Sequence, residues 1–172
     1  MIDLETLSTD ENSVVLSIGA VFFEKELGHN FYINLDINRQ LKDQRTVNGD
    51  TFRWWLGQSE EARKAILDNK PVELISALVA FQSFILNNMQ SDTSKLKVWG
   101  NGSTFDISIM ENLFKQYNMA VPWRYSNVRD LRTFKEYVAN DAPIERSEGH
   151  HNALTDAMDQ ANYVIKYTME KK

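Results

Sequence analysis

The strongest constraint on the fold is a long apolar stretch near the start of the chain, residues 14–24, which reads Val-Val-Leu-Ser-Ile-Gly-Ala-Val-Phe-Phe-Glu. A run this rich in β-branched and aromatic residues predicts a strand buried within a sheet. Residues 30–36 predict a neighbouring strand, connected through residues 25–29 with Gly28 as the turn residue. Residues 1–5 predict a shorter first strand, so the chain is expected to open as three strands in a meander.

Helices and strands alternate over the rest of the chain. Ser59 followed by Glu60 and Glu61 predicts a helix start, because a serine hydroxyl caps a helix and acids stabilise its first turn. Either Asp50 or Thr51 can cap the preceding helix. The expected helices cover residues 50–56, 60–67, 71–85, 105–117, 131–138 and 153–170, and short strands cover 96–99 and 126–130. The helix that Pro71 opens has apolar positions that follow helical spacing, namely Leu74, Ile75, Leu78, Val79, Phe81 and Ile85. This order predicts an α/β fold in which a mixed sheet is flanked by helices.

Length and composition limit the possible classes of protein. The 172 residues predict one domain, residues 1–172, and the absence of cysteine excludes disulfide scaffolds and zinc ribbons. The formal net charge of −5 argues against extended binding along a nucleic-acid duplex, which basic surfaces favour. No apolar run approaches the roughly 18 residues of a membrane span and no leader precedes the first motif, so a cytoplasmic protein is expected.

The predicted first strand carries two acids, Asp3 and Glu5, with Leu4 between them. Side chains at positions i and i+2 of a strand lie on the same face, so the two carboxylates are expected to point the same way. Neighbouring like charges are unfavourable unless a cation or a proton lies between them. The pair therefore indicates a metal site, although an ordinary solvent-exposed strand face has the same short pattern.

Two further acids and a histidine stand at predicted helix starts. Asp106 follows a predicted strand and a glycine-rich turn, in the first turn of a predicted helix. An acid at this position can also serve only to stabilise the helix through its dipole. His151 and Asp156 are five residues apart, about 140° around a helix, and cannot share a helical face. His151 is therefore expected before the final helix or in its first turn, and the adjacent His150 is a competitor for any role given to it. If residues 96–99 lie beside the first strand, these side chains meet where ligands bind in open α/β sheets.

The combined motifs are similar to those of a known family. In chain order they are Asp3-x-Glu5, then Asp106 at the end of Asn-Gly-Ser-Thr-Phe-Asp, and then His-x-x-x-x-Asp, in which four residues separate His151 from Asp156. This set resembles the DEDDh exonucleases, the DnaQ-like group of the ribonuclease H-like superfamily, over nearly the whole chain. Residues 51–63, with a tryptophan pair, and residues 129–133, Arg-Asp-Leu-Arg-Thr, are similar to a phage and prophage 3′–5′ exonuclease subfamily. That subfamily is similar in turn to a bacterial exoribonuclease resembling RNase T.

The resemblance implies a fold, a metal site and a role for each residue of the motifs. The implied fold is ribonuclease H-like, a five-stranded mixed sheet of order 3-2-1-4-5 with helices on both sides. The implied cofactors are two divalent ions, Mg²⁺ or Mn²⁺, which suit hard oxygen ligands. Asp3, Glu5 and Asp156 would hold the first ion, with Asp3 bridging to the second. Asp106 would support the cluster through water, and His151 would be the general base.

Aromatic and basic residues near these motifs are candidates for substrate contacts. Trp54 and Trp55 are adjacent and about 100° apart on a helix, so one can pack in the core while the other shapes a pocket for the terminal base. Packing of both is an equally good interpretation, and Leu7 is a candidate wedge against the last base. The candidates for phosphate contacts are Arg53, Arg129, Arg132 and Lys135, although each could equally form an ordinary surface ion pair.

The sequence therefore predicts a metal-dependent 3′–5′ exonuclease that releases nucleoside 5′-monophosphates from single-stranded ends, with DNA slightly favoured over RNA. The alternatives are a 3′–5′ exoribonuclease of the same fold and a nucleic-acid-binding module that has lost catalysis. A homodimer is expected because many members of the resembled family pair, and no membrane partner is expected. Asp3 lies only two residues from Met1, whereas a central strand usually has about five residues. We therefore expect that a few natural residues precede Met1, or that the numbering begins at an internal methionine.

Overall fold

A computed structural model of the chain describes residues 1–67, 70–149 and 151–169. Its first three strands, β1 (Ile2–Thr6), β2 (Val15–Phe23) and β3 (Leu27–Asn34), form an antiparallel sheet in the order β1-β2-β3. The predicted meander is therefore confirmed, and β1, at the edge of this sheet, has five residues, the usual length of a strand. Residues 15–21 of β2 are all buried, as the apolar run predicts.

The hairpin between β2 and β3 is tighter than predicted. Phe23 pairs with Leu27, so the connection consists of residues 24–26 and is closed by a 3.2 Å backbone hydrogen bond. Gly28 lies within β3, and its assignment as the turn residue is wrong. Three polar residues are enough to reverse the chain here, because strand pairing begins immediately on both sides of them.

The remaining two strands, β4 (Val98–Gly100) and β5 (Val128–Asp130), pair in parallel as a separate sheet. The predicted five-stranded sheet of order 3-2-1-4-5 is therefore corrected to a three-stranded antiparallel sheet and a two-stranded parallel sheet. Strands β1 and β4 contact each other without forming a ladder of hydrogen bonds. One physical reason is that the Leu4 N–H of β1 donates to the Asp106 carboxylate (3.2 Å), so a side chain takes a place that a strand partner would use.

The described helices are α1 (Ile37–Lys42), α2 (Gly49–Leu56), α3 (Glu60–Ile66), α4 (Leu74–Asn88), α5 (Asp106–Gln116), α6 (Leu131–Val138) and α7 (Ala153–Met169). Most of the helices lie where the sequence predicts them, and the differences concern α1, the cap of α2 and the start of α4. Of these, α1 was not predicted, and short 3₁₀ turns precede β4 and β5 at Thr93–Lys95 and Tyr125–Asn127. Ser59 caps α3 as predicted, whereas α2 is capped by Asn48 and neither by Asp50 nor by Thr51, whose N–H groups both donate to the Asn48 side chain.

Helix α4 differs from prediction in its start, and only some of its apolar positions are buried. It begins three residues after the predicted position, because Val72 pairs with Leu35 in an isolated β-bridge. The helical spacing of the apolar positions does not place all of them in the core, since Ile75 and Val79 are 47% and 51% exposed. The buried face consists of Leu74, Ala77, Leu78, Phe81 and Ile85.

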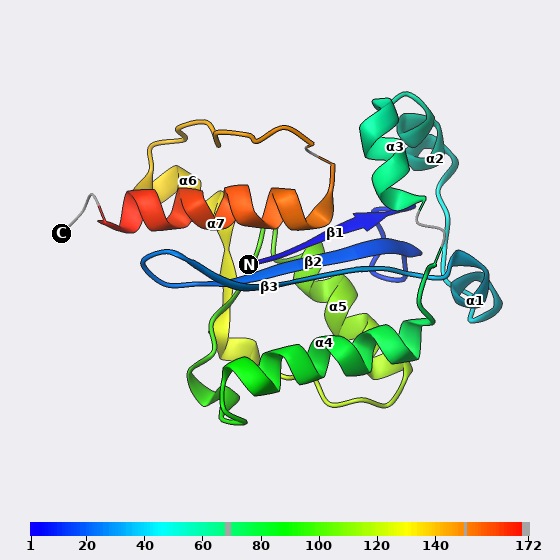
Figure 1. The fold of residues 1–172 in the computed structure, drawn as a ribbon, viewed down its shortest axis with the longest axis horizontal. Helices are drawn as coiled ribbons and strands as arrows, with labels where there is room; N and C mark the ends of the chain where they lie inside the picture. The colour runs from blue at the N-terminus through cyan, green and yellow to red at the C-terminus, as the bar shows by residue number, and fades with distance from the viewer. Residues whose placement is uncertain (68–69, 150, 170–172) are drawn as a thin grey trace.

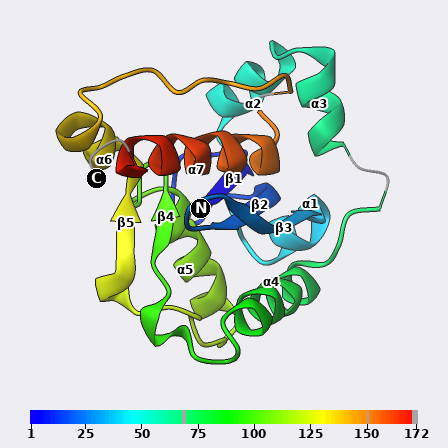
Figure 2. The same cartoon turned by 60° about the vertical axis from the view of Figure 1, so that its left-hand side comes forward.

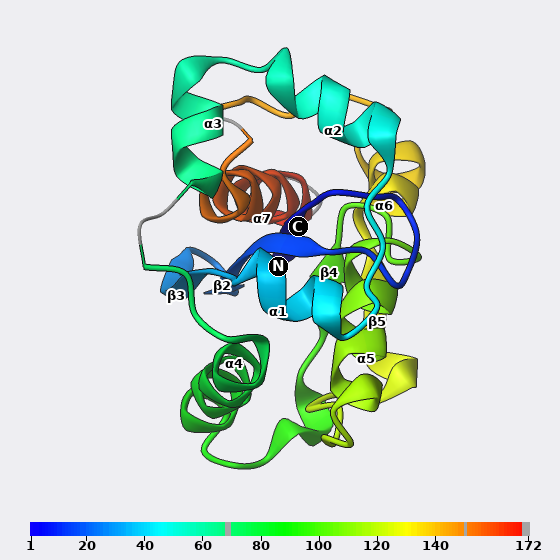
Figure 3. The same cartoon turned by 90° about the vertical axis from the view of Figure 1, so that its right-hand side faces the viewer.

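Helices cover both faces of the three-stranded sheet. Figure 1 shows α7 on one side of this sheet and α4 and α5 on the other. The largest apolar cluster lies on the α4 and α5 side around Ile18, Phe81 and Phe114, and a second cluster joins α6 and α7 around Val21 and Tyr163. Figure 2 shows β4 and β5 side by side next to α5. Figure 3 shows α2 and α3 on the same side of the sheet as α7. The end of β1, the start of α7 and α2 thus lie at one end of the molecule (Figure 1).

The described helices do not meet the requirements of a membrane span. A span needs about 20 mostly apolar residues. Across residues 1–67, 70–149 and 151–169, no helix has the length and apolar character to cross a bilayer.

Candidate active site

Strand β1 carries two of the predicted site residues on the face covered by α7. Asp3 pairs with Gly19 of β2 and Glu5 pairs with Ser17, and directly opposed residues of an antiparallel pair share a face. Glu5 is buried and Asp3 is half-buried. Leu4, between them, packs into the apolar cluster on the other side of the sheet. The alternation along β1 therefore gives the two carboxylates a common direction, as the spacing predicts.

Gly19 allows α7 to approach the sheet at this face. A Cβ atom on Gly19 would lie 2.1 Å from the Ala153 carbonyl carbon and 2.3 Å from the Leu154 nitrogen, distances at which atoms collide. Only a residue without a side chain permits this approach. The sequence interpretation gave Gly19 no role, yet a signal was present, because an isolated glycine inside an apolar strand often marks a close backbone contact.

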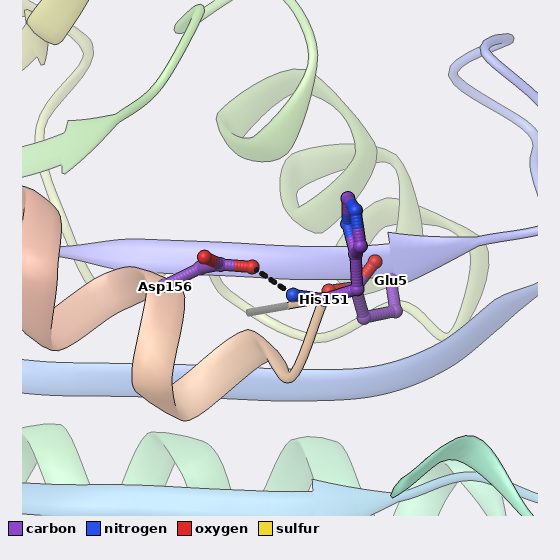
Figure 4. A group of neighbouring side chains, drawn as sticks. All are labelled: Glu5, His151 and Asp156. Atoms are coloured by element: carbon purple, nitrogen blue, oxygen red, sulfur yellow. Dashed lines mark hydrogen bonds between the residues drawn. The ribbon is translucent and has the colours of Figure 1, made fainter. Parts of the chain in front are cut away.

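The start of α7 brings the histidine and the fourth acid to the site. Asn152 caps the helix by accepting hydrogen bonds from the backbone N–H groups of Leu154 (3.0 Å) and Thr155 (3.2 Å). His151 precedes the helix with a left-handed backbone (φ 65°), an unusual conformation for a residue with a side chain. Its N–H donates to Asp156 Oδ2 at 2.8 Å, as the dashed line in Figure 4 marks. The predicted position of His151 before the helix or in its first turn is thus confirmed.

Three of the predicted site residues converge tightly. Glu5, His151 and Asp156 each offer one potential ligand atom, and these atoms lie within 4.8 Å of one another. Figure 4 shows the side chains reaching this point from β1, from the segment before α7 and from α7 itself. His150, the alternative to His151 as the functional histidine, lies outside the described residues.

Asp3 and Asp106 lie beside this group and are held by their own partners. Gln160 Nε2 donates a 2.7 Å hydrogen bond to Asp3 Oδ1. Asp106 accepts from the Leu4 N–H and packs so closely on Gly100 that a Cβ atom there would lie 3.2 Å from its carboxylate. The sequence interpretation missed Gln160, although its position four residues after Asp156 puts both side chains on one helix face.

Burial raises the pKa values of four acids, Asp3, Glu5, Asp106 and Asp156. Burial raises the pKa of Glu5 to about 8, and the charges of Asp156 and Asp106 act in the same direction. Burial also raises the pKa of Asp106 to about 7, although hydrogen bonds from backbone N–H groups, the first from Leu4, oppose the change. The pKa of Asp3 is raised well above its usual range, first by burial and then by repulsion from its acidic neighbours. The pKa of Asp156 is raised by burial, against the opposing hydrogen bond from the His151 N–H. The region thus disfavours several negative charges unless a cation accompanies them.

An open cleft of about 420 Å³ adjoins Glu5. Its lining residues are Leu4, Glu5, Thr6, Thr9, Asp50, Thr51, Trp54, Trp55 and Phe105. Trp54 is 46% exposed, and its ring meets the His151 ring edge to face at a centroid distance of 5.0 Å. Trp55 is 3% exposed and donates its indole N–H to the Thr6 carbonyl oxygen at 2.9 Å. Both tryptophans border the cleft, but Trp55 is the buried member of the pair and Trp54 is the exposed one.

The other predicted substrate residues occupy different surroundings. Leu7 is buried in the apolar cluster with Val14, Leu16, Trp55 and Ala62, so this packing does not support a role as a wedge against a base. Arg53 is exposed and lies 3.7 Å from Asp50, and Arg129 donates to the backbone carbonyls of its neighbours Ser126 and Val128. Arg132 is exposed, approaches Gly102, and lowers the pKa of Asp106 by its charge. Arg132 is thus the predicted arginine that acts electrostatically on the acid cluster.

The loop that leads to His151 is tied to one face of α7. Ser147 donates to Asp159 through its backbone N–H (2.7 Å) and its hydroxyl (2.6 Å). Further along the helix, the Tyr163 hydroxyl donates to the Ala142 carbonyl oxygen (2.7 Å), and Lys166 pairs with Glu145. Asp159, Tyr163 and Lys166 follow helical spacing, so α7 holds the loop with one face and carries Asp156 and Gln160 on an adjacent one.

Comparison with known proteins agrees with this arrangement. A family model described as a Rv2179c-like 3′-5′ exoribonuclease domain matches residues 1–168. A protein of Enterobacteria phage T4 named exodeoxyribonuclease is 26% identical over 157 residues, which cover 77% of this chain and 68% of the phage protein. The prediction that the chain is an exonuclease is therefore confirmed, and the alternative of a module without catalysis is not favoured. The match over nearly the entire chain means that the protein belongs to the family of Rv2179c-like 3′-5′ exoribonuclease domains.

Proposed function

We propose that the protein is a DEDDh-type 3′–5′ exonuclease that hydrolyses single-stranded DNA ends to nucleoside 5′-monophosphates with the help of two divalent ions, Mg²⁺ or Mn²⁺. The observation that carries the proposal is the convergence of Glu5, His151 and Asp156 within 4.8 Å. The charge of Asp106 helps to raise the pKa of Glu5. The charges of Asp106, Glu5 and Asp156 help to raise the pKa of Asp3, which therefore lies close to this group. Membership of an exonuclease family supports phosphodiester hydrolysis as the reaction of this site.

The residues around the convergence suit a hard divalent cation. Carboxylate oxygens are preferred ligands of Mg²⁺ and Mn²⁺, and a cation relieves the repulsion that helps to raise the pKa values of Asp3 and Glu5. Asp3, Glu5 and Asp156 would hold the first ion, Asp3 would be shared with the second, and Asp106 would support the cluster through water. When bound, two such ions would activate a water molecule, neutralise the phosphate and stabilise the leaving 3′ oxygen.

His151 is proposed to accept the proton of the attacking water. Imidazole is the side chain most often used for this role, and a base must lie within reach of the reacting groups. The His151 ring lies beside the convergence of ligand atoms and against Trp54, while its backbone is held by Asp156. These contacts support a base that is oriented before substrate binds.

The cleft next to Glu5 is the proposed site for the terminal nucleotide. The exposed Trp54 ring offers a surface on which a base can stack, and such stacking accepts any base. Arg132, whose charge acts on Asp106, is the best placed of the predicted arginines for a phosphate contact. Recognition of one end needs few contacts, so a net charge of −5 is compatible with this function.

A 3′–5′ exoribonuclease is the second candidate function. The phage relative carries the name exodeoxyribonuclease, which supports DNA, whereas the description of the family model names an exoribonuclease domain, which supports RNA. Discrimination requires a contact that senses the 2′-hydroxyl group. Matched DNA and RNA oligomers of one sequence, with free and with blocked 3′ ends, measure the preference directly.

The proposal is tested with the purified full chain and a single-stranded oligomer labelled at its 5′ end. In Mg²⁺ or Mn²⁺ we expect stepwise shortening from the 3′ end and release of nucleoside 5′-monophosphates. Excess EDTA should abolish the reaction. Asp3→Ala should reduce the rate at least 100-fold, because changes to residues that only support metal ligands already cost about 10–100-fold. Glu136→Gln, an exposed acid on α6, is the matched control and should retain full activity.

A separate variant tests the role of the histidine. His151→Ala should lower kcat by roughly 100-fold or more, the usual contribution of a general base, while Mn²⁺ binding is retained. Activity that persists in excess EDTA, or Asp3→Ala with wild-type activity, would contradict the metal mechanism. Full activity of His151→Ala would contradict the assignment of the base.

The homodimer and the organisation as one domain over residues 1–172 stay predictions. Light scattering on the purified chain measures the mass in solution, and the calculated mass of one chain is 19.9 kDa. A mass of twice this value is the expected result. A mass equal to that of one chain would contradict the predicted pairing.

A further inference from the structure

We propose that Gln160 is a positioning residue that orients the Asp3 carboxylate for a divalent cation. The inference rests on the proposed function, because it concerns the same group of acids. Gln160 lies on α7, one turn after Asp156, and its side chain is directed toward β1. It is only 4% exposed, so water cannot readily replace the contact that it makes.

The contact with Asp3 is direct. Gln160 Nε2 donates to Asp3 Oδ1 at 2.7 Å across 157 positions of sequence. Such a bond strengthens when the carboxylate is ionised, so it favours the form that binds a cation. It also engages one carboxylate oxygen specifically, which limits the rotation of the side chain and leaves Oδ2 outside the contact.

The amide oxygen of Gln160, Oε1, has no hydrogen-bond donor among the described residues although it is buried. Buried polar atoms are nearly always paired, and ionised carboxylates can only accept hydrogen bonds. A water molecule held by a cation is a donor that could satisfy this oxygen. The amide therefore suits a site that contains both acids and a hydrated cation.

A neutral amide is better suited to this position than a basic side chain. Lysine or arginine would pair with Asp3 and neutralise the charge that attracts a cation. An amide orients the carboxylate by a hydrogen bond and leaves its full charge for the metal. Partners of this kind, which hold a ligand without touching the metal, set the geometry of many metal sites.

The second carboxylate of β1 has a similar neighbour. Ser17 lies opposite Glu5 on the same face of the sheet, is fully buried, and has a hydroxyl without a hydrogen-bond partner among the described residues. Two buried polar groups with an unsatisfied atom thus lie next to the two acids of β1. This coincidence supports a site whose hydrogen bonds are completed only when a hydrated ion is present.

The test is Gln160→Met, which keeps the length of the side chain and removes both its donor and its acceptor. Mn²⁺ binding is measured by calorimetry, and the rise in melting temperature with Mn²⁺ is measured on the same samples. We expect Mn²⁺ affinity to fall by roughly 10–100-fold, the range found for indirect partners of metal ligands. The metal-free melting temperature should stay close to that of the wild type, since one hydrogen bond and one unsatisfied acceptor are removed together.

Asn162→Leu is the matched control, because it removes an exposed amide from the same helix. It should bind Mn²⁺ as the wild type does. Wild-type Mn²⁺ affinity in Gln160→Met would overturn the inference. A lowered metal-free melting temperature with an unchanged response to Mn²⁺ would also overturn it, because that result indicates a role in folding alone.

A second variant of Gln160 and the wild type itself distinguish a failure of folding from a failure of metal binding. If Gln160→Met does not fold, Gln160→Asn retains the polar amide but is one methylene shorter, and it should show the same loss of Mn²⁺ affinity. If it binds Mn²⁺ as tightly as the wild type, the inference is wrong. Failure of the wild type itself to bind a divalent cation would contradict the proposed function, and not only the role of Gln160.

Discussion

Four carboxylates lie in one buried region around β1 and the starts of α5 and α7, and burial raises the pKa of each of them. A carboxyl group with a raised pKa is protonated in the folded protein at pH values where the unfolded chain has already lost the proton. Without a cation, the folded protein therefore holds extra protons near neutral pH. The stability of the metal-free protein must then depend on pH.

The sign of this dependence follows from the individual residues. The pKa of Glu5 is about 8 and that of Asp106 is about 7, against ordinary values of 4.5 and 3.8. The protons that the folded protein binds more tightly than the unfolded chain stabilise the fold. This stabilisation is fully present below the ordinary pKa values and is lost as the pH rises through the folded-state pKa values. The free energy of unfolding should therefore fall as pH increases across this window, by up to about 1.4 kcal/mol per pH unit for each extra proton.

Urea unfolding in excess EDTA, repeated across this pH window, measures the slope. Glu5→Gln should flatten it, because the variant lacks a carboxyl group whose pKa is raised to about 8, whereas Glu136→Gln on the exposed face of α6 should leave it unchanged. Identical slopes for the wild type and Glu5→Gln would rule out Glu5 as a source of the dependence.

The two tryptophans should differ in what their removal changes. Trp55 is buried and bonded to the Thr6 carbonyl oxygen, so Trp55→Ala should lower the free energy of unfolding by about 3–5 kcal/mol. Trp54 lies half in the cleft, so Trp54→Ala should fold and raise KM by roughly tenfold, within the 1–3 kcal/mol typical of base stacking. Denaturant unfolding and steady-state kinetics measure the two effects. A Trp54→Ala variant with unchanged KM would remove this residue from the proposed nucleotide site.

At the scale of secondary-structure elements, the site depends on how closely α7 packs against β2. This contact brings Asp156 and His151, from the end of the chain, to the acids of β1 at its start (Figure 4). The contact is possible because Gly19 has no side chain facing Ala153. A change in one element should therefore alter metal binding by residues that belong to another.

Gly19→Ala is predicted to displace α7. The added methyl group would overlap backbone atoms, which cannot rotate away as a side chain can. The free energy of unfolding should fall by at least about 1–3 kcal/mol, as for other overpacked sites, and Mn²⁺ affinity should fall as well. Gly49→Ala is the control, because a Cβ atom there has no neighbour within 4 Å, and it should change stability by less than about 0.5 kcal/mol. Gly19→Ala with normal stability and normal Mn²⁺ affinity would contradict the importance of this contact.

The sequence was informative about elements whose signals are local. The apolar run identified β2, and Ser59 with its two acids identified the start of α3, because burial patterns and caps involve neighbouring residues. Helix α1 was missed, since its buried residue is Gln40, whose side chain bonds the Val15 backbone at both its N–H (2.8 Å) and its carbonyl oxygen (2.7 Å). A polar residue used in this way gives no hydrophobic signal.

At the scale of the whole molecule, the acidic composition and the proposed metal site are linked. Two divalent ions would change the formal net charge from −5 to about −1. They would also bind the folded protein in preference to the unfolded chain, where the acids are far apart, and so stabilise the fold by mass action. The stabilisation should grow with pH, because protons and cations compete for the same carboxylates.

Thermal unfolding with and without Mn²⁺ tests this link. At a concentration about 100 times the dissociation constant, Mn²⁺ should stabilise the protein by about 2.7 kcal/mol and raise the melting temperature by roughly 5–10 °C. Asp156→Asn, which removes one proposed ligand, should show a much smaller rise. An equal rise in the wild type and in this variant would mean that Mn²⁺ binds elsewhere.

By itself the sequence determined the three-stranded meander, most of the helices and the five residues proposed for catalysis. These conclusions depend on periodicity and on motif spacing, which are properties of short segments. It left two interpretations of the tryptophan pair open, and the structure decided between them, because Trp55 is 3% exposed and Trp54 is 46% exposed.

The tertiary structure alone decided that the five strands form two sheets, that Gly19 admits α7 and that Gln160 holds Asp3. Each of these depends on the distance between segments that are far apart in the sequence. The Leu4 N–H can bond either to a strand or to a carboxylate, and only the position of α5 determines that the partner is Asp106. Local patterns contain no information about such distances, because they arise from packing of the entire chain.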